Sequence, residues 1–175
     1  VSYDLSSYDI DLSNGDYVIN VEARITDDIS GVFDGTYANG SGGSASQVTW
    51  TSPSGQNLSA GYFDNPDSGN SLDGTYVDTT SLSQNAENGT WTISSFYVAD
   101  ESGNTKYYTT DELNALGIQT TMEVSGGASD TTAPSLVSYD LSSYDIDLSN
   151  GDYVINVEAR ITDDISGVFD GTYAN

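Results

Sequence analysis

Apolar and polar residues alternate along residues 17–25 with a period of two. The apolar members are Tyr17, Ile19, Val21, Ala23 and Ile25, and the residues between them are Val18, Asn20, Glu22 and Arg24. Successive side chains of a strand point to opposite faces, so this pattern predicts a strand with one buried face. Arg24 falls on the other face, where we expect it to pair with a carboxylate.

Similar runs rich in β-branched and aromatic residues predict further strands. These runs cover residues 1–5, 47–52, 58–63, 74–82, 90–99, 104–109, 119–124 and 136–141. Turn dipeptides such as Asn14-Gly15 and Asn88-Gly89 separate them. Helical periodicity is nearly absent, and only residues 111–116 suggest one helical turn, with Thr110 as its N-cap.

About seven strands at this spacing predict an all-β fold, a Greek-key β-sandwich. The two tryptophans, Trp50 and Trp91, fall within predicted strands. We expect their rings to lie in the core, and a role as ligand platforms is the alternative.

Residues 137–175 repeat residues 1–39 without a single substitution. The repeat distance is 136 residues, the difference between positions 137 and 1. Such identity predicts a tandem repeat from a longer array. We therefore expect one repeat at residues 1–124 that lacks the start of its first strand, a linker at residues 125–134, and the N-terminal third of an identical second repeat at residues 135–175.

The opening strands of the second repeat carry an apolar face that they cannot bury alone. We expect this face to contact neighbouring identical repeats or chains head to tail, as in a filament. The alternative is a truncated segment that makes no such contact.

Charge excludes one class of partner. The chain has 27 Asp and Glu residues against 3 Lys and Arg, a formal net charge of −24. Nucleic acid is therefore an unsuitable partner, because its binding requires clustered basic residues. Self-repulsion of this size predicts neutralisation by divalent cations or by high salt; the alternative is that the acidity serves only to keep the protein in solution.

Composition also limits the covalent and metal chemistry. There are no cysteines and no histidines, so a disulfide framework and the usual zinc and copper ligands are excluded. No apolar stretch approaches the ~20 residues of a membrane span, so we expect no membrane insertion in this segment. We expect any export signal or anchor to lie outside it.

Acidic side chains gather in the loops of the predicted sandwich. Three loops, which follow residues 17–25, 58–63 and 90–99, share one end of such a fold with the linker. The candidate metal ligands in them are Asp27, Asp28, Asp64, Asp67, Asp73, Asp100, Glu101 and Asn104, together with Asp130 in the linker and Asp163 and Asp164 in the second copy. Calcium takes six to eight hard oxygen ligands from flexible loops and fits this set better than magnesium does. The sequence therefore predicts Ca²⁺ as the cofactor.

Several motifs, taken in order, resemble bacterial immunoglobulin-like tandem repeats of large calcium-dependent surface or secreted proteins of the adhesin type. They are Asp-Thr-Thr-Ala-Pro at 130–134, Ile-Thr-Asp-Asp-Ile-Ser-Gly-Val at 25–32, Ser-Pro-Ser-Gly-Gln at 52–56, Asp-Gly-Thr-Tyr at 73–76, Gly-Thr-Trp-Thr-Ile at 89–93 and Asp-Glu-Ser-Gly-Asn at 100–104. The resemblance covers essentially the whole repeat. It implies an immunoglobulin-like spacer at the bacterial cell surface or outside the cell, with calcium near the junctions. Because the chain has no histidine, no cysteine and no nucleophile motif, we expect no enzymatic activity.

Two other functions and one covalent modification stay open. A carbohydrate- or cell-binding module could use surface glycans as partners through the Tyr107-Tyr108 pair. A glycoside hydrolase requires two placed carboxylates, but abundant acidic residues do not indicate one. The only lysine, Lys106, lies near Asn104 and could form an intramolecular isopeptide bond if both were buried with a carboxylate.

Overall fold

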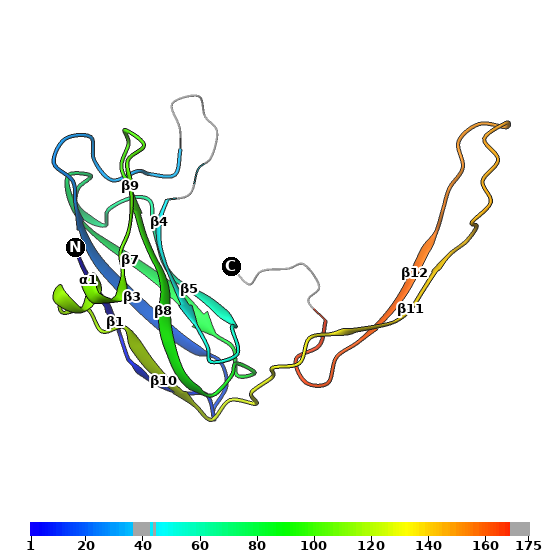
Figure 1. Cartoon of the computed structure of the whole chain (residues 1–175), viewed down its shortest axis with the longest axis horizontal. Coiled ribbons are helices and arrows are strands. Elements are labelled where there is room, and N and C mark those ends of the chain that lie inside the picture. Colours follow the sequence, from blue (N-terminus) through cyan, green and yellow to red (C-terminus); the bar gives the residue numbers. More distant parts are fainter. Residues whose placement is uncertain (37–42, 44, 169–175) are drawn as a thin grey trace. The chain divides into compact units, whose positions relative to one another are not determined.

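The computed structural model describes residues 1–36, 43 and 45–168, arranged in two compact units (Figure 1). Unit 1 spans Val1–Ser129 and unit 2 spans Asp130–Asn175. The last seven residues of the second copy, 169–175, lie outside the described residues.

Four antiparallel strands form the first sheet of unit 1. In spatial order they are β1 (Ser2–Leu5), β3 (Tyr17–Thr26), β7 (Asp73–Leu82) and β6 (Ser68–Asn70). Strand β3 buries Ile19, Val21, Ala23 and Ile25 and exposes the residues between them, which confirms the predicted alternation. Arg24 pairs with a carboxylate, as predicted, and that carboxylate belongs to Asp73 at the start of β7.

Six strands form the second sheet. They are β2 (Asp9–Asp11), β10 (Thr121–Ser125), β8 (Gly89–Ala99), β4 (Ser46–Thr51) and β5 (Asn57–Phe63), with β9 (Thr105–Tyr107) paired to the end of β8. Strands β2 and β10 run parallel, and the other pairs are antiparallel. The two sheets enclose one apolar core, so the predicted all-β sandwich is confirmed at this level.

Two strands, β2 and β6, have no counterpart among the predicted ones. Each has three residues, which is too short for a period of two to be recognised. Strand β9 is also shorter than the predicted strand at residues 104–109.

The core is built around aromatic side chains. Trp50 and Trp91 are fully buried, as predicted. The indole N–H of Trp50 donates to the hydroxyl of Tyr3 at 3.0 Å, and that hydroxyl donates to the carbonyl of Ala60 at 2.9 Å. Burial raises the pKa of the Tyr3 phenol well above its ordinary value. This chain of hydrogen bonds joins β1 of one sheet to β4 and β5 of the other.

Helix α1 (Thr110–Ala115) lies between β9 and β10. The predicted N-cap, Thr110, is wrong: Thr109 caps the helix instead. Glu112 stands three residues after Thr109, so the two side chains form a reciprocal capping box with each other's backbone N–H groups. Among the described residues no helix is long and apolar enough to cross a membrane.

Unit 2 contains a two-stranded antiparallel hairpin of β11 (Ser135–Leu141) and β12 (Val157–Thr162). Its register matches that of β1 and β3, because Tyr139 pairs with Ala159 as Tyr3 pairs with Ala23. The two copies thus form the same strand pair, although only the first lies within a sandwich.

Candidate metal centre

Three loops of unit 1 meet at one end of the sandwich, which we call the loop pole and which comprises residues 27–34, 64–73 and 100–104. Thr26 pairs with Asp73, and Val32 forms a bridge with Asp100. The amide of Glu101 donates to the carbonyl of Gly31 at 2.9 Å. The topology therefore brings eight of the candidate ligands to one end of the fold.

Most carboxylates at the loop pole bind backbone amides. Asp27 Oδ2 accepts hydrogen bonds from the amides of the residues that follow it, at 3.2, 2.9 and 2.8 Å; these donors are Ile29, Ser30 and Gly31. The hydrogen bond from Gly31 is the main reason why the pKa of Asp27 lies below its ordinary value. Asp27 thus closes the turn that follows β3.

The loop after β8 is held in a similar way. Asp100 accepts the backbone amide of Asn104 at 2.7 Å and its side-chain amide at 2.6 Å. The side-chain hydrogen bond from Asn104 is the main cause of the lowered pKa of Asp100. Glu101 Oε1 accepts the amide of Asp34 at 3.0 Å.

The acids between β5 and β7 are also committed to protein partners. Asp64 accepts the amide of Asn65 at 2.7 Å, and Asp67 accepts the amide of Val77 at 2.7 Å. Asp73 forms a two-point ion pair with Arg24, with N–O distances of 2.9 and 2.7 Å. A guanidinium group beside Asp73 disfavours a cation at that carboxylate.

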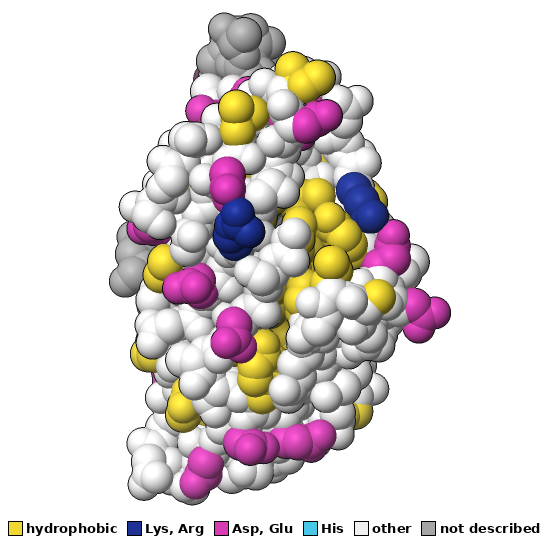
Figure 2. All heavy atoms as spheres, turned by 90° about the vertical axis from the view of Figure 1, so that its left-hand side faces the viewer, with side chains coloured by type: hydrophobic (Ala, Val, Ile, Leu, Met, Phe, Trp, Pro, Cys, Tyr) yellow, Lys and Arg dark blue, Asp and Glu magenta, His cyan; other side chains and the backbone are white. Residues whose placement is uncertain are grey.

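Asp27 and Asp100 line a common pocket of about 170 Å³ at the loop pole, together with Asn104 and Lys106. Asp28, the neighbour of Asp27, is exposed. No three carboxylates of the described part of unit 1 come within 4.8 Å of one another. Acidic side chains are instead spread over the whole length of the face drawn in Figure 2. The described residues of the loop pole therefore do not bring together three carboxylates that could hold a metal ion.

Unit 2 brings three candidate ligands together. Asp130, Asp163 and Asp164 each offer a carboxylate oxygen within 4.8 Å of the other two. Asp163 and Asp164 are the second copies of Asp27 and Asp28, and Asp130 comes from the predicted linker. We call these three residues the aspartate triad.

Backbone amides hold the triad in place. Asp130 is 7% exposed and accepts amides of Thr132 at 3.1 Å and of Ser166 at 3.0 Å. Hydrogen bonding from Ser166, above all from its side chain, lowers the pKa of Asp130. Asp163 Oδ1 accepts the amide of Gly167 at 2.7 Å.

One oxygen of the triad lacks a hydrogen bond. Oδ2 of Asp163 is buried and has no hydrogen-bond partner among the described residues. A buried polar atom normally has a partner, so this oxygen is suited to a cation. Three carboxylates are a hard, anionic donor set that fits calcium, whereas magnesium favours fewer protein ligands and more water.

The two copies build the same turn. Asp27 and Asp163 each accept the amide four residues ahead, from Gly31 and Gly167, and both glycines have left-handed backbone, with φ of 92° and 85°. The counterpart of Asp130 in the first repeat would lie seven residues before Val1, as 130 does before 137. The linker position that corresponds to Asp130 is therefore described only for the second copy.

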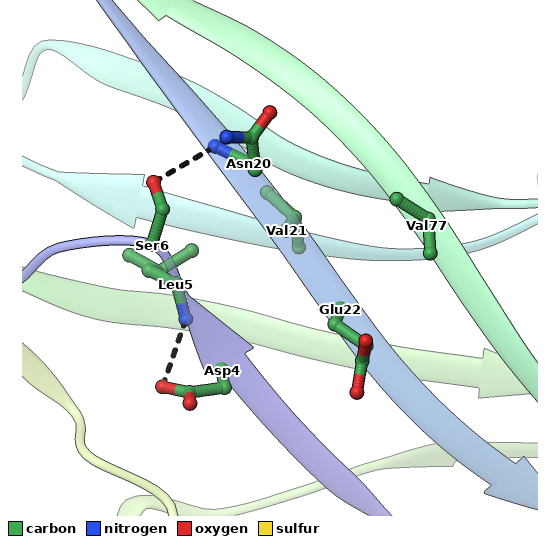
Figure 3. A pocket seen from close by; sticks show the side chains of 7 residues that line it. All are labelled: Asp4, Leu5, Ser6, Asn20, Val21, Glu22 and Val77. Carbon is green, nitrogen blue, oxygen red and sulfur yellow. Dashed lines mark hydrogen bonds between the residues drawn. The ribbon is translucent and has the colours of Figure 1, made fainter.

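A shallow pocket on the outer face of the first sheet is lined by Asp4 and Glu22, which are paired across β1 and β3 (Figure 3). Its other lining residues are Leu5, Ser6, Asn20, Val21 and Val77. Two carboxylates without further acidic neighbours are a weaker donor set than the triad, and we assign no site to this pocket.

The two adjacent tyrosines do not form one platform. Tyr107 is exposed and its ring lies 4.9 Å from the ring of Tyr97, whereas Tyr108 packs edge-on against Phe96. Lys106 is also exposed and forms an ion pair with Glu112 at 3.0 Å. An isopeptide bond requires a buried lysine, and Lys106 does not meet that condition.

Comparison with protein-family models, with curated proteins and with solved structures found no match. The candidate ligands inferred from the sequence include all three residues of the triad, but nothing in the sequence analysis groups them. The repeat could have indicated the group, because it places an Asp-Asp pair at a fixed distance after the linker aspartate.

Proposed function

We propose that this chain is part of a structural tandem-repeat protein in which calcium fixes each linker to the start of the following repeat. The observation that carries the proposal is the aspartate triad, which joins Asp130 of the linker to Asp163 and Asp164 of the second copy. A cation there adds to the hydrogen bonds that already tie Asp130 to the turn after β12. Rigid junctions between repeats make an array stiff and extended.

The proposed fold is immunoglobulin-like with Greek-key connections. It is supported by the strand order, in which β3 and β7 lie in one sheet and β4 and β8 in the other. We place such an array at a bacterial cell surface or in a secreted protein, where repeats meet head to tail and can form a filament. This placement follows from the resemblance of the sequence motifs to such repeats.

The repeat suggests which ligands complete the site. In unit 1, Asp100 lines the same pocket as Asp27 and is hydrogen-bonded to Ser30 in the turn of Asp27. A complete second repeat would bring its counterpart of Asp100 to Asp163 in the same way. Four carboxylates and nearby carbonyls approach the six to eight oxygens that calcium takes.

The test is calcium titration of the full chain by calorimetry. We expect one site with a dissociation constant of about 10⁻⁴–10⁻³ M, the range of extracellular calcium modules. Asp163→Asn should weaken binding at least about tenfold, because it removes a charge from the triad. The matched control is Asp27→Asn, the same change in the first copy, where the described residues do not gather three carboxylates, and it should leave the affinity within about twofold.

Two results would contradict the proposal. One is the absence of calcium binding at about 10 mM calcium, well above the expected constant. The other is an equal loss of affinity in Asp163→Asn and Asp27→Asn, which would place the ion elsewhere. Catalysis is not part of the proposal, since most of the described acids at the loop pole bind backbone amides or Arg24.

A second candidate, carbohydrate binding, is favoured by a row of exposed and half-buried side chains on the outer face of the second sheet. Tyr62, Gln47, Tyr97 and Tyr107 are neighbours across β5, β4, β8 and β9 in the strand register. Tyrosine rings on a flat sheet can stack on sugar rings, and Gln47 can hydrogen-bond to sugar hydroxyl groups.

A glycan array probed with the full chain tests this candidate. We expect Tyr97→Ala to remove the glycan signals, because Tyr97 lies at the centre of the row. Tyr153→Ala is the control, since that tyrosine lies in the second copy. An array without signals for the unaltered chain would refute carbohydrate binding and leave the structural proposal intact.

A further inference from the structure

The sequence contains four Asn-Gly pairs, which begin at Asn14, Asn39, Asn88 and Asn150. An asparagine before glycine is prone to react with its own backbone, because glycine has no side chain to hinder the attacking nitrogen. Asn39 lies outside the described residues, and the Asn150 pair repeats the Asn14 pair. Asn14 and Asn88 both belong to unit 1 and both are exposed, so the two pairs can be compared within one folded unit.

The side chain of Asn88 is fixed at both of its polar atoms. Its Oδ1 accepts the amide of Gly127 at 2.8 Å, and its Nδ2 donates to the carbonyl of Gly127 at 2.9 Å. We call these two hydrogen bonds the Gly127 clamp. The next residue, Gly89, pairs with Val124 in the ladder between β8 and β10. The fold therefore holds both the side-chain carbon and the backbone nitrogen that would have to meet.

The side chain of Asn14, in the turn between β2 and β3, is held much more weakly. Among the described residues it makes one hydrogen bond, from Nδ2 to the hydroxyl of Ser13 at 3.4 Å. Apart from its chain neighbours, no atom lies within 4 Å of the position that a Cβ would take on Gly15. The amide of Gly15 donates to the carbonyl of Leu12 at 3.1 Å, near the long end of the usual range. An exposed turn of this kind opens locally at low cost, and opening frees the Gly15 nitrogen.

We propose that Asn14 is a site of spontaneous deamidation and that the fold protects Asn88 from the same reaction. The backbone nitrogen of Gly15 gives up its proton to solvent and forms a bond to Cγ of Asn14. The bond between Cγ and Nδ2 breaks, and the side-chain nitrogen takes up a proton from solvent and leaves as ammonia. A five-membered imide ring remains.

Water then opens the imide ring. It adds to one of the two ring carbonyls, the bond from that carbon to the ring nitrogen breaks, and the nitrogen regains its proton. Opening at the side-chain carbonyl gives aspartate. Opening at the backbone carbonyl gives isoaspartate, in which the main chain runs through the former side chain. The net reaction consumes water and releases ammonia, and it requires no oxidant or reductant.

The turn that contains Asn14 also holds the segment by which the chain leaves unit 1. The amide of Leu12 donates to the carbonyl of Ser125 at 2.8 Å, and Asp16 Oδ1 accepts the amide of Gln84 at 2.7 Å. Deamidation adds a negative charge to this acidic turn, and isoaspartate also lengthens its backbone. Both changes oppose the turn geometry that places Leu12 against Ser125. The reaction therefore loosens the start of the linker.

Peptide mapping of the full chain after incubation at mildly alkaline pH tests the proposal, because the attacking nitrogen must first lose its proton. Trypsin cleaves after basic residues and places Asn14, Asn88 and Asn150 on three different peptides. Mass spectrometry detects deamidation as the mass difference between water and ammonia. Fragmentation of the peptides separates Asn88 from Asn39, and an isoaspartyl methyltransferase with labelled methyl donor detects the isoaspartate product.

In the folded chain we expect Asn14 to react at least about tenfold faster than Asn88, because reaction at Asn88 requires the Gly127 clamp to open. The same incubation in denaturant is the control and should bring the two rates within about twofold, since both residues precede glycine. Equal rates in the folded chain would overturn the proposal. An intact Asn14 in the folded chain, at a time when the denatured chain has reacted, would overturn it as well.

Hydrogen exchange at the amide of Leu12 tests the effect on the linker. We expect this amide to exchange faster in the deamidated chain, because its hydrogen bond to Ser125 is weakened. The matched control is Asn14→Gln, which keeps an amide side chain but would have to close a larger ring; incubated in the same way, it should show unchanged exchange. Unchanged exchange in a deamidated chain would refute the loosening. No step involves calcium, so these outcomes are separate from those of the metal-site proposal.

Discussion

At the scale of single residues, the two copies place the same side chain in two environments. Tyr3 connects the sheets through its hydroxyl group, whereas Tyr139 is half exposed. The value of a buried hydrogen bond can therefore be measured within one polypeptide, with the second copy as an internal reference.

Tyr3→Phe should lower the free energy of unfolding of unit 1 by about 1–3 kcal/mol, because it leaves the Trp50 N–H and the Ala60 carbonyl without this partner in the core. Tyr139→Phe should change it by less than about 0.5 kcal/mol, as is usual for surface substitutions. Denaturant unfolding followed by tryptophan fluorescence measures both. Equal effects of the two substitutions would contradict the role assigned to the Tyr3 hydroxyl.

At the scale of elements, the capping box of α1 shows how one local motif controls a titration. The backbone amide of Thr109 donates to Glu112 at 2.9 Å, and Lys106 forms an ion pair with the same carboxylate. These contacts, the amide first, lower the pKa of Glu112 from 4.5 to about 2.

Because the folded-state pKa of Glu112 lies below its unfolded value, its stabilising contribution is complete above about pH 4.5 and is lost as the pH falls towards about 2. We expect an NMR titration of the Glu112 side chain to show this low pKa. Lys106→Ala and Thr109→Ala should each raise it. A pKa near 4.5 in the unaltered chain would show that the capping box does not form in solution.

The long strands were easier to predict from the sequence than the N-cap of α1 and the three-residue strands β2 and β6. The alternation along β3 predicted both its buried face and the pairing of Arg24, because a period of two sustained over many residues is typical of a half-buried strand. Strands β2 and β6 exist through pairing with β10 and β7, and their own residues carry no comparable signal. The choice between Thr109 and Thr110 as N-cap depended on Glu112.

The site was predictable as a region and not as a set of ligands. Topology gathers Asp27, Asp73 and Asp100 at the loop pole, as the sequence indicated. Whether a carboxylate is free to bind a metal ion depends on its tertiary contacts, such as the ion pair that Asp73 forms with Arg24. Those partners lie far away in the chain, so no local motif reveals them.

At the scale of the whole molecule, a net charge of −24 opposes close association of acidic units. The proposed calcium sites place cations where linker and repeat meet. These cations reduce repulsion at the junctions, whereas the rest of the surface stays strongly negative.

The identity of the two copies also has a consequence for synthesis of the chain. A ribosome releases residues 1–39 before residues 45–125 and these before residues 137–175, and domains fold from the N-terminus as they emerge. Residues 45–125 therefore fold with the copy that precedes them. Refolding from denaturant removes this order and lets both copies compete, so a newly made chain and a refolded chain should differ in the proportion of molecules with the original pairing.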